Sequence, residues 1–133
     1  MKENLVYNEK ARVTISRTFT FDSAHYLKEY VGKCSNLHGH TYKLEVFVRG
    51  PLDDRGFVCD YGIIKDIVKT KVLDLLDHKN LSGILMCNTT AENMVVFIYS
   101  LLQMPFNRVG FSLVKVKLWE TADSCAEYSG EMY

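Results

Sequence analysis

Two runs in which apolar and polar residues alternate place the strongest limit on how this chain can fold. In residues 12–21 the odd positions are mostly apolar and the even positions are mostly threonine or serine. Residues 38–50 show the same alternation, with large apolar side chains at even positions. A period of two predicts β-strands with one buried face. The side chains expected on these buried faces are Val13, Ile15, Phe19 and Phe21 in the first run and Tyr42, Leu44, Val46 and Val48 in the second.

Two helices are predicted to follow these strands. Apolar residues recur at helical spacing over residues 63–76, with charged residues between them. A second helix is expected to begin at the T-x-x-E capping box formed by Thr89 and Glu92. It is expected to end near Met104, because Pro105 follows.

Two further strands complete the predicted order of elements. Residues 109–120 and 125–128 are the predicted strands, whereas residues 24–37 have no period and are expected to form a loop. The order ββααββ predicts one α+β domain over residues 1–133. In such a domain both helices cover one face of an antiparallel sheet.

The charge balance excludes several kinds of partner. Lys and Arg total 16, as do Asp and Glu, so the formal net charge is zero. No nucleic acid and no anionic membrane surface is therefore expected as a partner bound mainly by charge. No apolar stretch is long enough to span a bilayer. Residues 1–10 are polar and lack the apolar centre of a signal peptide, so a disordered leader and a cytoplasmic location are expected.

The four cysteines agree with that location. Cys34, Cys59, Cys87 and Cys125 are widely separated, and no two of them form a C-x-x-C pair. A disulfide framework and a structural zinc site made of paired thiols are therefore not expected. Cys59 and Cys125 are interpreted as bystander thiols. Cys34 differs because Lys33 and several histidines are its neighbours, so it could be a metal ligand, a base or a nucleophile.

Three of the four histidines lie close together in the sequence. His38 and His40 share the inward parity of the second strand, and His25 is in register with the first strand's apolar face if that strand continues. Each ring alone could be a hydrogen-bonded core histidine. Three together are better explained by a metal, because three neutral imidazoles suit Zn²⁺ and leave a fourth position open. Iron, nickel and copper also accept imidazole, so spacing alone does not choose the ion.

Two further positions have more than one interpretation. His78 ends the first predicted helix, where it could interact with the helix dipole or be oriented by Asp77 for proton transfer. Glu120 has the parity of Val114, which is expected to be buried, so its carboxylate needs hydrogen-bond donors. Those donors could be Thr121 and backbone N–H groups. They could also be the paired N–H groups on the amino-pyrimidine edge of a pterin or guanine.

Five short motifs together resemble one known family. They are residues 21–25 (FDSAH), 34–40 (CSNLHGH), 76–81 (LDHKNL), 90–93 (TAEN) and 119–121 (WET). Each motif alone is weak, but five in the family's order and spacing are specific. The family comprises the 6-pyruvoyl-tetrahydropterin synthases and the 6-carboxy-tetrahydropterin synthases of queuosine biosynthesis.

This resemblance implies a fold, an assembly and a metal centre. The fold would be the tunnelling fold, in which three subunits close their sheets into a barrel and two such rings stack as a homohexamer. His25, His38 and His40 match the zinc ligands of the family. Cys34 matches its catalytic cysteine, which acts as a base rather than as a ligand.

The remaining matches concern the substrate and proton transfer. Asp77 and His78 match a catalytic pair that a neighbouring subunit supplies, so that active sites lie at subunit interfaces. Glu120 matches the glutamate that anchors the pterin ring, and Thr90 and Glu92 fall in a segment that lines the same pocket. The implied substrate is the small molecule 7,8-dihydroneopterin triphosphate.

The resemblance leaves the product to be chosen between two branches of the family. The carboxy-forming branch releases acetaldehyde and triphosphate, whereas the pyruvoyl branch eliminates triphosphate only. The short gap between Cys34 and His38 resembles the bacterial carboxy-forming enzymes, so a zinc-dependent carbon–carbon lyase is expected. A non-catalytic pterin- or purine-binding protein is a further alternative, although it would not need both Cys34 and His78. Cys125 departs from the family, in which tryptophan is common at that place.

Overall fold

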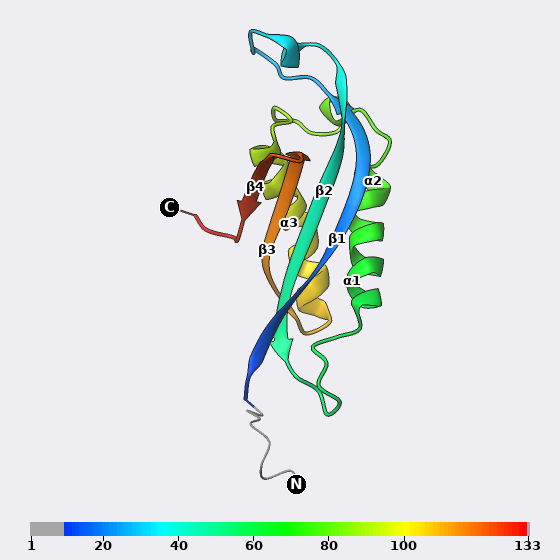
Figure 1. Cartoon of the computed structure of the whole chain (residues 1–133), viewed down its shortest axis with the longest axis vertical. Helices are drawn as coiled ribbons and strands as arrows, with labels where there is room; N and C mark the ends of the chain where they lie inside the picture. Colours follow the sequence, from blue (N-terminus) through cyan, green and yellow to red (C-terminus); the bar gives the residue numbers. More distant parts are fainter. Residues whose placement is uncertain (1–9, 133) are drawn as a thin grey trace.

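Four strands form a single antiparallel sheet. The structure, a computed structural model, describes residues 10–132, so all but the last residue of the predicted leader lies outside the described residues. The strands are adjacent in the order β1-β2-β3-β4 (Figure 1). Their bounds are Arg12–His25 for β1, His38–Pro51 for β2, Ser112–Thr121 for β3 and Ser124–Tyr128 for β4.

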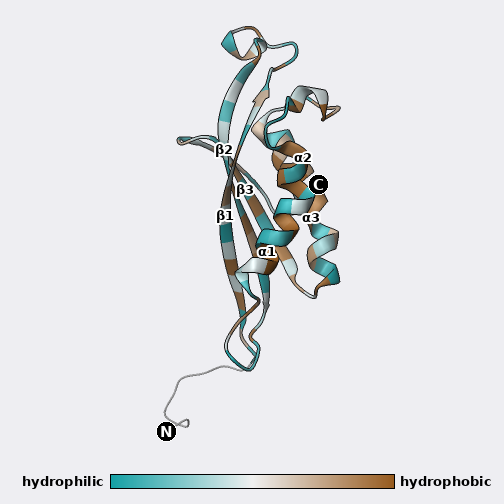
Figure 2. Cartoon of the chain, turned by 90° about the vertical axis from the view of Figure 1, so that its right-hand side faces the viewer, coloured by the Kyte–Doolittle hydropathy of each residue, from teal (hydrophilic) through white to brown (hydrophobic). Residues whose placement is uncertain are grey.

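The helices cover one face of this sheet. Their bounds are Tyr61–Val68 for α1, Lys69–Leu73 for a π-helical turn, Asp74–Leu76 for α2 and Ala91–Arg108 for α3. Figure 2 shows these segments together on the same side of the strands. The predicted α+β architecture is therefore confirmed. Among residues 10–132, no helix combines the length and apolarity needed to cross a bilayer.

The pairing of β1 with β2 is longer than the sequence pattern predicted. All 14 residues of β1 have a partner on β2. A loop was expected from residue 24, but Ala24 pairs with Gly39 and His25 pairs with His38. The backbone of Ala24 also forms a parallel bridge with Asn80, which supports the strand end from its other side. This second support explains why β1 continues to His25.

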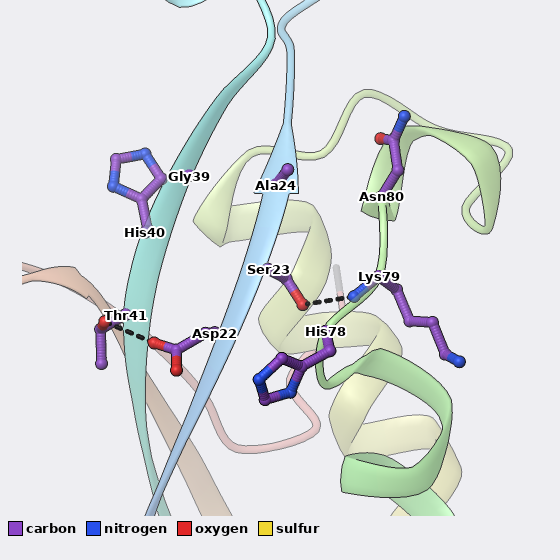
Figure 3. A pocket seen from close by; sticks show the side chains of 9 residues that line it. All are labelled: Asp22, Ser23, Ala24, Gly39, His40, Thr41, His78, Lys79 and Asn80. Atoms are coloured by element: carbon purple, nitrogen blue, oxygen red, sulfur yellow. Dashed lines mark hydrogen bonds between the residues drawn. The ribbon is translucent and has the colours of Figure 1, made fainter.

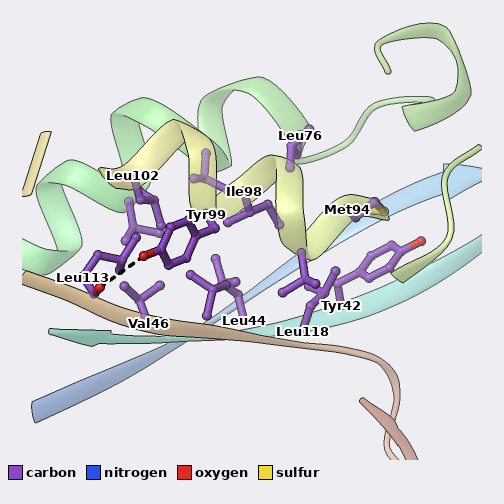
Figure 4. Packing of buried hydrophobic residues seen from close by; sticks show 14 of the residues in the cluster. Tyr42, Leu44, Val46, Leu76, Met94, Ile98, Tyr99, Leu102, Leu113 and Leu118 are labelled. Carbon is purple, nitrogen blue, oxygen red and sulfur yellow. Dashed lines mark hydrogen bonds between the residues drawn. The ribbon is translucent and has the colours of Figure 1, made fainter. Parts of the chain in front are cut away.

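The core lies between the sheet and the helices (Figure 4). Burying one large aliphatic side chain contributes about 1.5–3 kcal/mol, so this layer contact fixes which face of each strand points inward. The fully buried side chains that meet across it include Leu44, Val46, Leu118, Ile64, Leu76, Met94, Ile98 and Leu102.

A β-bulge alters the predicted buried face of β3. The β2–β3 register shifts between Phe47 and Val48, which leaves one extra residue on β3. Leu113 is consequently buried, whereas Val114 is only half-buried. The prediction that Val114 points inward is therefore wrong. Beyond the bulge the predicted parity holds, and Leu118 is fully buried.

The first residue of α3 also differs from the prediction. Thr90, rather than Thr89, is the N-cap, since its side chain accepts a hydrogen bond from the N–H of Asn93 at 3.1 Å. The hydroxyl of Thr89 is instead within hydrogen-bond distance of Ser82 and Tyr26. Asn93 therefore takes the place expected for Glu92, and its Nδ2 donates to the carbonyl of Asn88. The predicted T-x-x-E capping box does not form among the described residues.

Pro105 does not end α3, which continues for about one more turn. A proline inside a helix lacks an N–H and crowds the carbonyl four residues earlier, so a helix end was expected. Phe106, however, is fully buried in the core. Its carbonyl also accepts hydrogen bonds from the N–H groups of Val109 and Phe111, both at 3.1 Å. The burial of Phe106 explains the extra turn, and the predicted end near Met104 is wrong.

Candidate metal centre and active site

Three histidines meet where β1 ends and β2 begins. His25 is the last residue of β1 and pairs with His38, and His40 lies two residues further along β2 on the same face. Their ring centroids are between 4.6 and 5.0 Å apart. One ring nitrogen from each lies within 4.8 Å of the other two. The sheet therefore brings the three rings together, as their parity predicted.

Hydrogen bonds determine which nitrogens of two rings face each other. Nδ1 of His25 lies 2.8 Å from the carbonyl oxygen of Thr89, and Nδ1 of His38 lies 2.7 Å from that of Asn36. A carbonyl only accepts, so both Nδ1 atoms carry hydrogen and, in neutral rings, both Nε2 atoms carry a lone pair. These Nε2 atoms are 3.1 Å apart. Two lone pairs at this distance repel each other unless a proton or a cation lies between them.

His40 adds a third unsatisfied nitrogen. Its Nε2 is buried, and no hydrogen bond reaches it from any residue that the structure describes. Oε1 of Glu120 is 3.6 Å away, beyond hydrogen-bond distance. Burial lowers the pKa of His40 below 6.5, the carboxylate of Glu120 opposes this, and the neighbouring His25 and His38 lower it further. The ring is therefore mainly neutral at pH 7.

This geometry fits a divalent transition-metal ion. With zinc–nitrogen bonds of about 2.0–2.1 Å, two ligands of a tetrahedral zinc are about 3.3 Å apart, close to the His25–His38 separation. Metal-bound histidines usually donate their other N–H to a carbonyl or carboxylate, as these two rings do to Thr89 and Asn36. Three imidazoles also leave a coordination position open. The same donors would accept iron, nickel or copper.

Cys34 lies in the loop that joins β1 to β2, within the short 3₁₀ helix Lys33–Ser35. The loop folds back on itself, because the N–H of Leu27 donates to the carbonyl of Cys34 at 2.7 Å. The thiol is half-buried. Within the described part of the chain, no hydrogen bond or ion pair joins it to the histidine cluster or to Asp77 and His78. The single chain therefore leaves these proposed catalytic groups unconnected.

Asp77 and His78 follow α2 and are bound to β1. Oδ1 of Asp77 accepts the N–H of Asp22 at 3.0 Å and lies 2.9 Å from Nδ1 of His78. The N–H of His78 donates to the carbonyl of Asp22 at 2.6 Å. These bonds hold His78 at a φ of +57°, a left-handed conformation that costs such a residue about 1–2 kcal/mol. The two side chains thus touch, and the imidazole projects into solvent with 77% of its surface exposed.

The carboxyl of Asp77 is stabilised in its ionised form. Partial desolvation raises its pKa, but the hydrogen bonds from Asp22 and His78, together with the charge of His78, lower it by more. The net pKa is below the ordinary aspartate value, so the group is a carboxylate at neutral pH. A carboxylate on Nδ1 holds the imidazole with its other nitrogen pointing outward, which suits proton transfer.

One pocket is lined by both His78 and His40, the one histidine of the cluster that reaches it. It has a volume of about 610 Å³, and Figure 3 shows His40 and His78 on opposite sides of β1 at its margin. Lys79 and Asn80 also line it. Asp22 is the acidic residue of this pocket, and its carboxylate accepts a hydrogen bond from the hydroxyl of Thr41.

A second pocket of about 610 Å³ lies between the start of α3 and the β3–β4 turn. Among residues 10–132, no basic side chain lines it. Glu120, which is adjacent to His40, places this pocket next to the histidine cluster. Thr90 is not among the residues that line it; its hydroxyl caps α3. The ionisable side chains that line it are Glu92, Glu120, Asp123, Glu127 and Cys125.

Sequence reasoning missed the groups that orient the histidines. Two of them are the carbonyls of Thr89 and Asn36, and every residue has a carbonyl, so no sequence signal identifies them. The third is Tyr42, predicted only as a core residue, whose hydroxyl lies 3.4 Å from Nδ1 of His25. Burial and the nearby charge of Glu120 raise the pKa of Tyr42, so its hydroxyl stays protonated.

Removing one ring of the cluster should abolish metal retention. We expect the wild type to hold one divalent ion per chain after dialysis, and His38→Ala to bind it more than about 100-fold more weakly, beyond the effect of an outer contact. His78→Ala is a matched control, because His78 is the histidine outside the cluster, and it should retain the ion. Metal content is measured by inductively coupled plasma mass spectrometry. Equal loss from both variants, or full retention by His38→Ala, would contradict the site.

Known proteins resemble this chain over nearly its whole length. The family model described as 6-pyruvoyl tetrahydropterin synthase matches residues 14–131. The 6-carboxy-5,6,7,8-tetrahydropterin synthase of Haemophilus influenzae is 36% identical over 139 residues, covering 86% of this chain and 96% of that protein. The 6-pyruvoyl tetrahydrobiopterin synthase of Dictyostelium discoideum is 37% identical over 137 residues, covering 90% and 97%.

Solved structures share the same architecture. The 6-pyruvoyl tetrahydropterin synthase of Caenorhabditis elegans superimposes with a TM-score of 0.82 at 30% identity, covering 94% of this chain and all of that one. The Plasmodium falciparum enzyme of the same name gives a TM-score of 0.72 at 19% identity over 92% of this chain, which supports the fold alone. With the motifs, the sheet and the family match in agreement, the chain belongs to the 6-pyruvoyl tetrahydropterin synthase family.

Proposed function

We propose that this protein is a zinc-dependent lyase of 7,8-dihydroneopterin triphosphate. It would consume one water molecule, produce 6-carboxy-5,6,7,8-tetrahydropterin and release acetaldehyde and triphosphate, a reaction of queuosine biosynthesis. The observation that best supports this proposal is the convergence of one ring nitrogen from each of three histidines beside the carboxylate of Glu120.

His25, His38 and His40 would hold the zinc ion through their Nε2 atoms. When bound, zinc would act as a Lewis acid toward the hydroxyl groups of the substrate side chain and make them and the adjacent C–H more acidic. Two of the rings are set for this role by their Nδ1–H bonds to carbonyls, and His40 by its neutral form. Metal binding requires neutral imidazole, so these features favour a loaded site at pH 7.

The pocket between α3 and the β3–β4 turn, here called the acidic pocket because carboxylates line it, suits the pterin ring rather than the triphosphate. Carboxylates accept the paired N–H groups of an amino-pyrimidine edge, and they repel phosphate. Glu120 would anchor the ring, because it lies both in this pocket and beside His40. Glu92 lines the same pocket, and Thr90 would contribute by starting α3 at its margin. A ring held there keeps the substrate side chain within reach of the metal centre.

Cys34 and the Asp77–His78 pair would move protons. The thiolate of Cys34 would remove a proton from the substrate side chain, and His78, held by Asp77, would deliver or accept a proton through its exposed ring. Since no contact joins Cys34 to this pair within one described chain, the pair would act on the site of a neighbouring subunit. We therefore also propose a homohexamer with active sites at subunit interfaces.

A pyruvoyl-forming reaction is the main alternative. The Dictyostelium relative, named a pyruvoyl enzyme, is as similar to this chain as the Haemophilus relative, named a carboxy enzyme. The short gap between Cys34 and His38 favours the carboxy branch. Cys125 lines the acidic pocket, so the residue that departs from the family can influence which substrate fits. A non-catalytic pterin-binding protein is the second alternative.

Product analysis separates these three proposals. We expect the zinc-loaded protein to convert 7,8-dihydroneopterin triphosphate with release of one acetaldehyde for each triphosphate, both measured in the same reaction. Triphosphate without acetaldehyde would indicate the pyruvoyl reaction instead. Tight binding of the substrate without either product would indicate a binding protein and contradict the catalytic proposal.

Cys34→Ala tests the proposed base. Turnover should fall by about 10²–10⁴-fold, the usual contribution of a general base, while zinc content and sedimentation behaviour stay unchanged. Cys87→Ala is the control, because Cys87 is exposed and lines neither pocket. Loss of zinc from Cys34→Ala would make Cys34 a ligand, and unchanged turnover would exclude it as the base.

A further inference from the structure

We propose that Ser82 is a positioning residue of the metal centre, because its hydroxyl binds the backbone of Tyr26 and the side chain of Thr89, the two residues that border the His25 imidazole. Ser82 lies in the short 3₁₀ helix Leu81–Gly83, far from His25 in the sequence. None of the family motifs described above assigns it a role. The inference rests on the proposed metal site and concerns how that site keeps its geometry.

The hydroxyl of Ser82 uses all of its hydrogen-bonding capacity. Its oxygen accepts the N–H of Tyr26 at 3.0 Å, and its hydrogen points to the carbonyl of Tyr26 at 3.1 Å. The hydroxyl of Thr89 is 3.2 Å away. Since the serine hydrogen is used on Tyr26, Thr89 is the donor between these two hydroxyls. The single hydroxyl hydrogen of Thr89 also lies within reach of the Tyr26 carbonyl, at 3.4 Å, so Ser82 and this carbonyl share it. One donor and two acceptor positions are all that a hydroxyl has.

Both partners of Ser82 determine the position of His25. Tyr26 is the next residue in the chain. Its N–H belongs to the peptide that leaves His25, so the bond from this N–H to Ser82 fixes that peptide, and the bond to its carbonyl fixes the peptide after it. Thr89 provides the carbonyl that accepts the Nδ1–H of His25 at 2.8 Å. His25 itself is completely buried. Ser82 therefore holds the backbone from which the ring projects. Through the side chain of Thr89 it also restrains the residue whose carbonyl sets the rotation of the ring.

A separate set of hydrogen bonds, without Ser82, joins the loop that follows β1 to the loop that precedes α3. The N–H of Lys28 donates to Oδ1 of Asn88 at 3.0 Å, and Nδ2 of Asn88 donates to the carbonyl of Lys28 at 3.3 Å. Nδ2 of Asn93 in α3 also donates to the carbonyl of Asn88 at 2.9 Å. Removing the Ser82 hydroxyl should therefore leave the loops in place, while it frees the N–H and carbonyl of Tyr26 and loosens the side chain of Thr89. The expected defect lies in metal affinity rather than in folding.

Three variants test this role. The measurement is the Zn²⁺ dissociation constant of the metal-stripped protein, by competition with a chelator, together with urea unfolding of the same metal-free samples. Ser82→Ala should weaken zinc binding by about 10–100-fold, the effect of losing an outer contact to a metal ligand. Ser82→Thr keeps the hydroxyl and should stay near the wild type. Ser100→Ala, which removes an exposed hydroxyl bonded only to the carbonyl of Phe97, should do the same.

A spectroscopic readout separates positioning from general stability. With Co²⁺ in place of zinc, the visible absorption of Ser82→Ala should shift, because the ligand field depends on the orientation of the His25 ring. Unchanged zinc affinity and unchanged Co²⁺ spectrum in Ser82→Ala would overturn the inference, even if the urea midpoint fell. Failure of Ser82→Thr to restore affinity would overturn it as well. A wild type that binds no divalent ion would instead refute the proposed metal site, and the inference with it.

Discussion

The antiparallel pairing of β1 with β2 is the interaction on which the rest of this structure depends. It places His25 directly opposite His38 and puts His40 on the same face. Because side chains alternate between faces, a slip of one residue would turn rings to opposite sides of the sheet. The apolar residues along the same face prevent such a slip, since they are buried against the helices. A core built from ordinary hydrophobic contacts thus sets the geometry of the polar centre.

The same strand also positions the proposed proton-transfer pair. The backbone of Asp22, three residues before His25, binds both the carboxylate of Asp77 and the N–H of His78. β1 therefore contributes to both sites. Its last residue, His25, points inward to the cluster, and its backbone at Asp22 binds the Asp77–His78 pair. The nitrogens of the cluster face one another as lone-pair acceptors, whereas His78 is exposed. The difference in burial therefore suits the three clustered histidines to metal binding and the exposed His78 to proton transfer.

Much of this arrangement follows from the sequence, because alternation and helical spacing report burial directly. They identified the strands, both helical segments and the shared face of His25, His38 and His40. The bulge opposite Phe47 and the extra turn after Pro105 were not predictable, since each results from packing between distant elements. The role of the Thr89 carbonyl was not predictable for a different reason, because backbone acceptors have no sequence signature. The roles proposed for Cys34 and the Asp77–His78 pair depend on contacts between copies of the chain, and no pattern within one sequence specifies such contacts.

Zinc K-edge X-ray absorption on the loaded protein reports the ligands of the ion themselves. We expect three imidazole nitrogens and one further oxygen or nitrogen at about 2.0–2.1 Å, with no sulfur. A sulfur scatterer at about 2.3 Å would place Cys34 or another thiol on the ion. Either that result or fewer than three imidazoles would contradict a centre built from His25, His38 and His40 with one position left for the substrate.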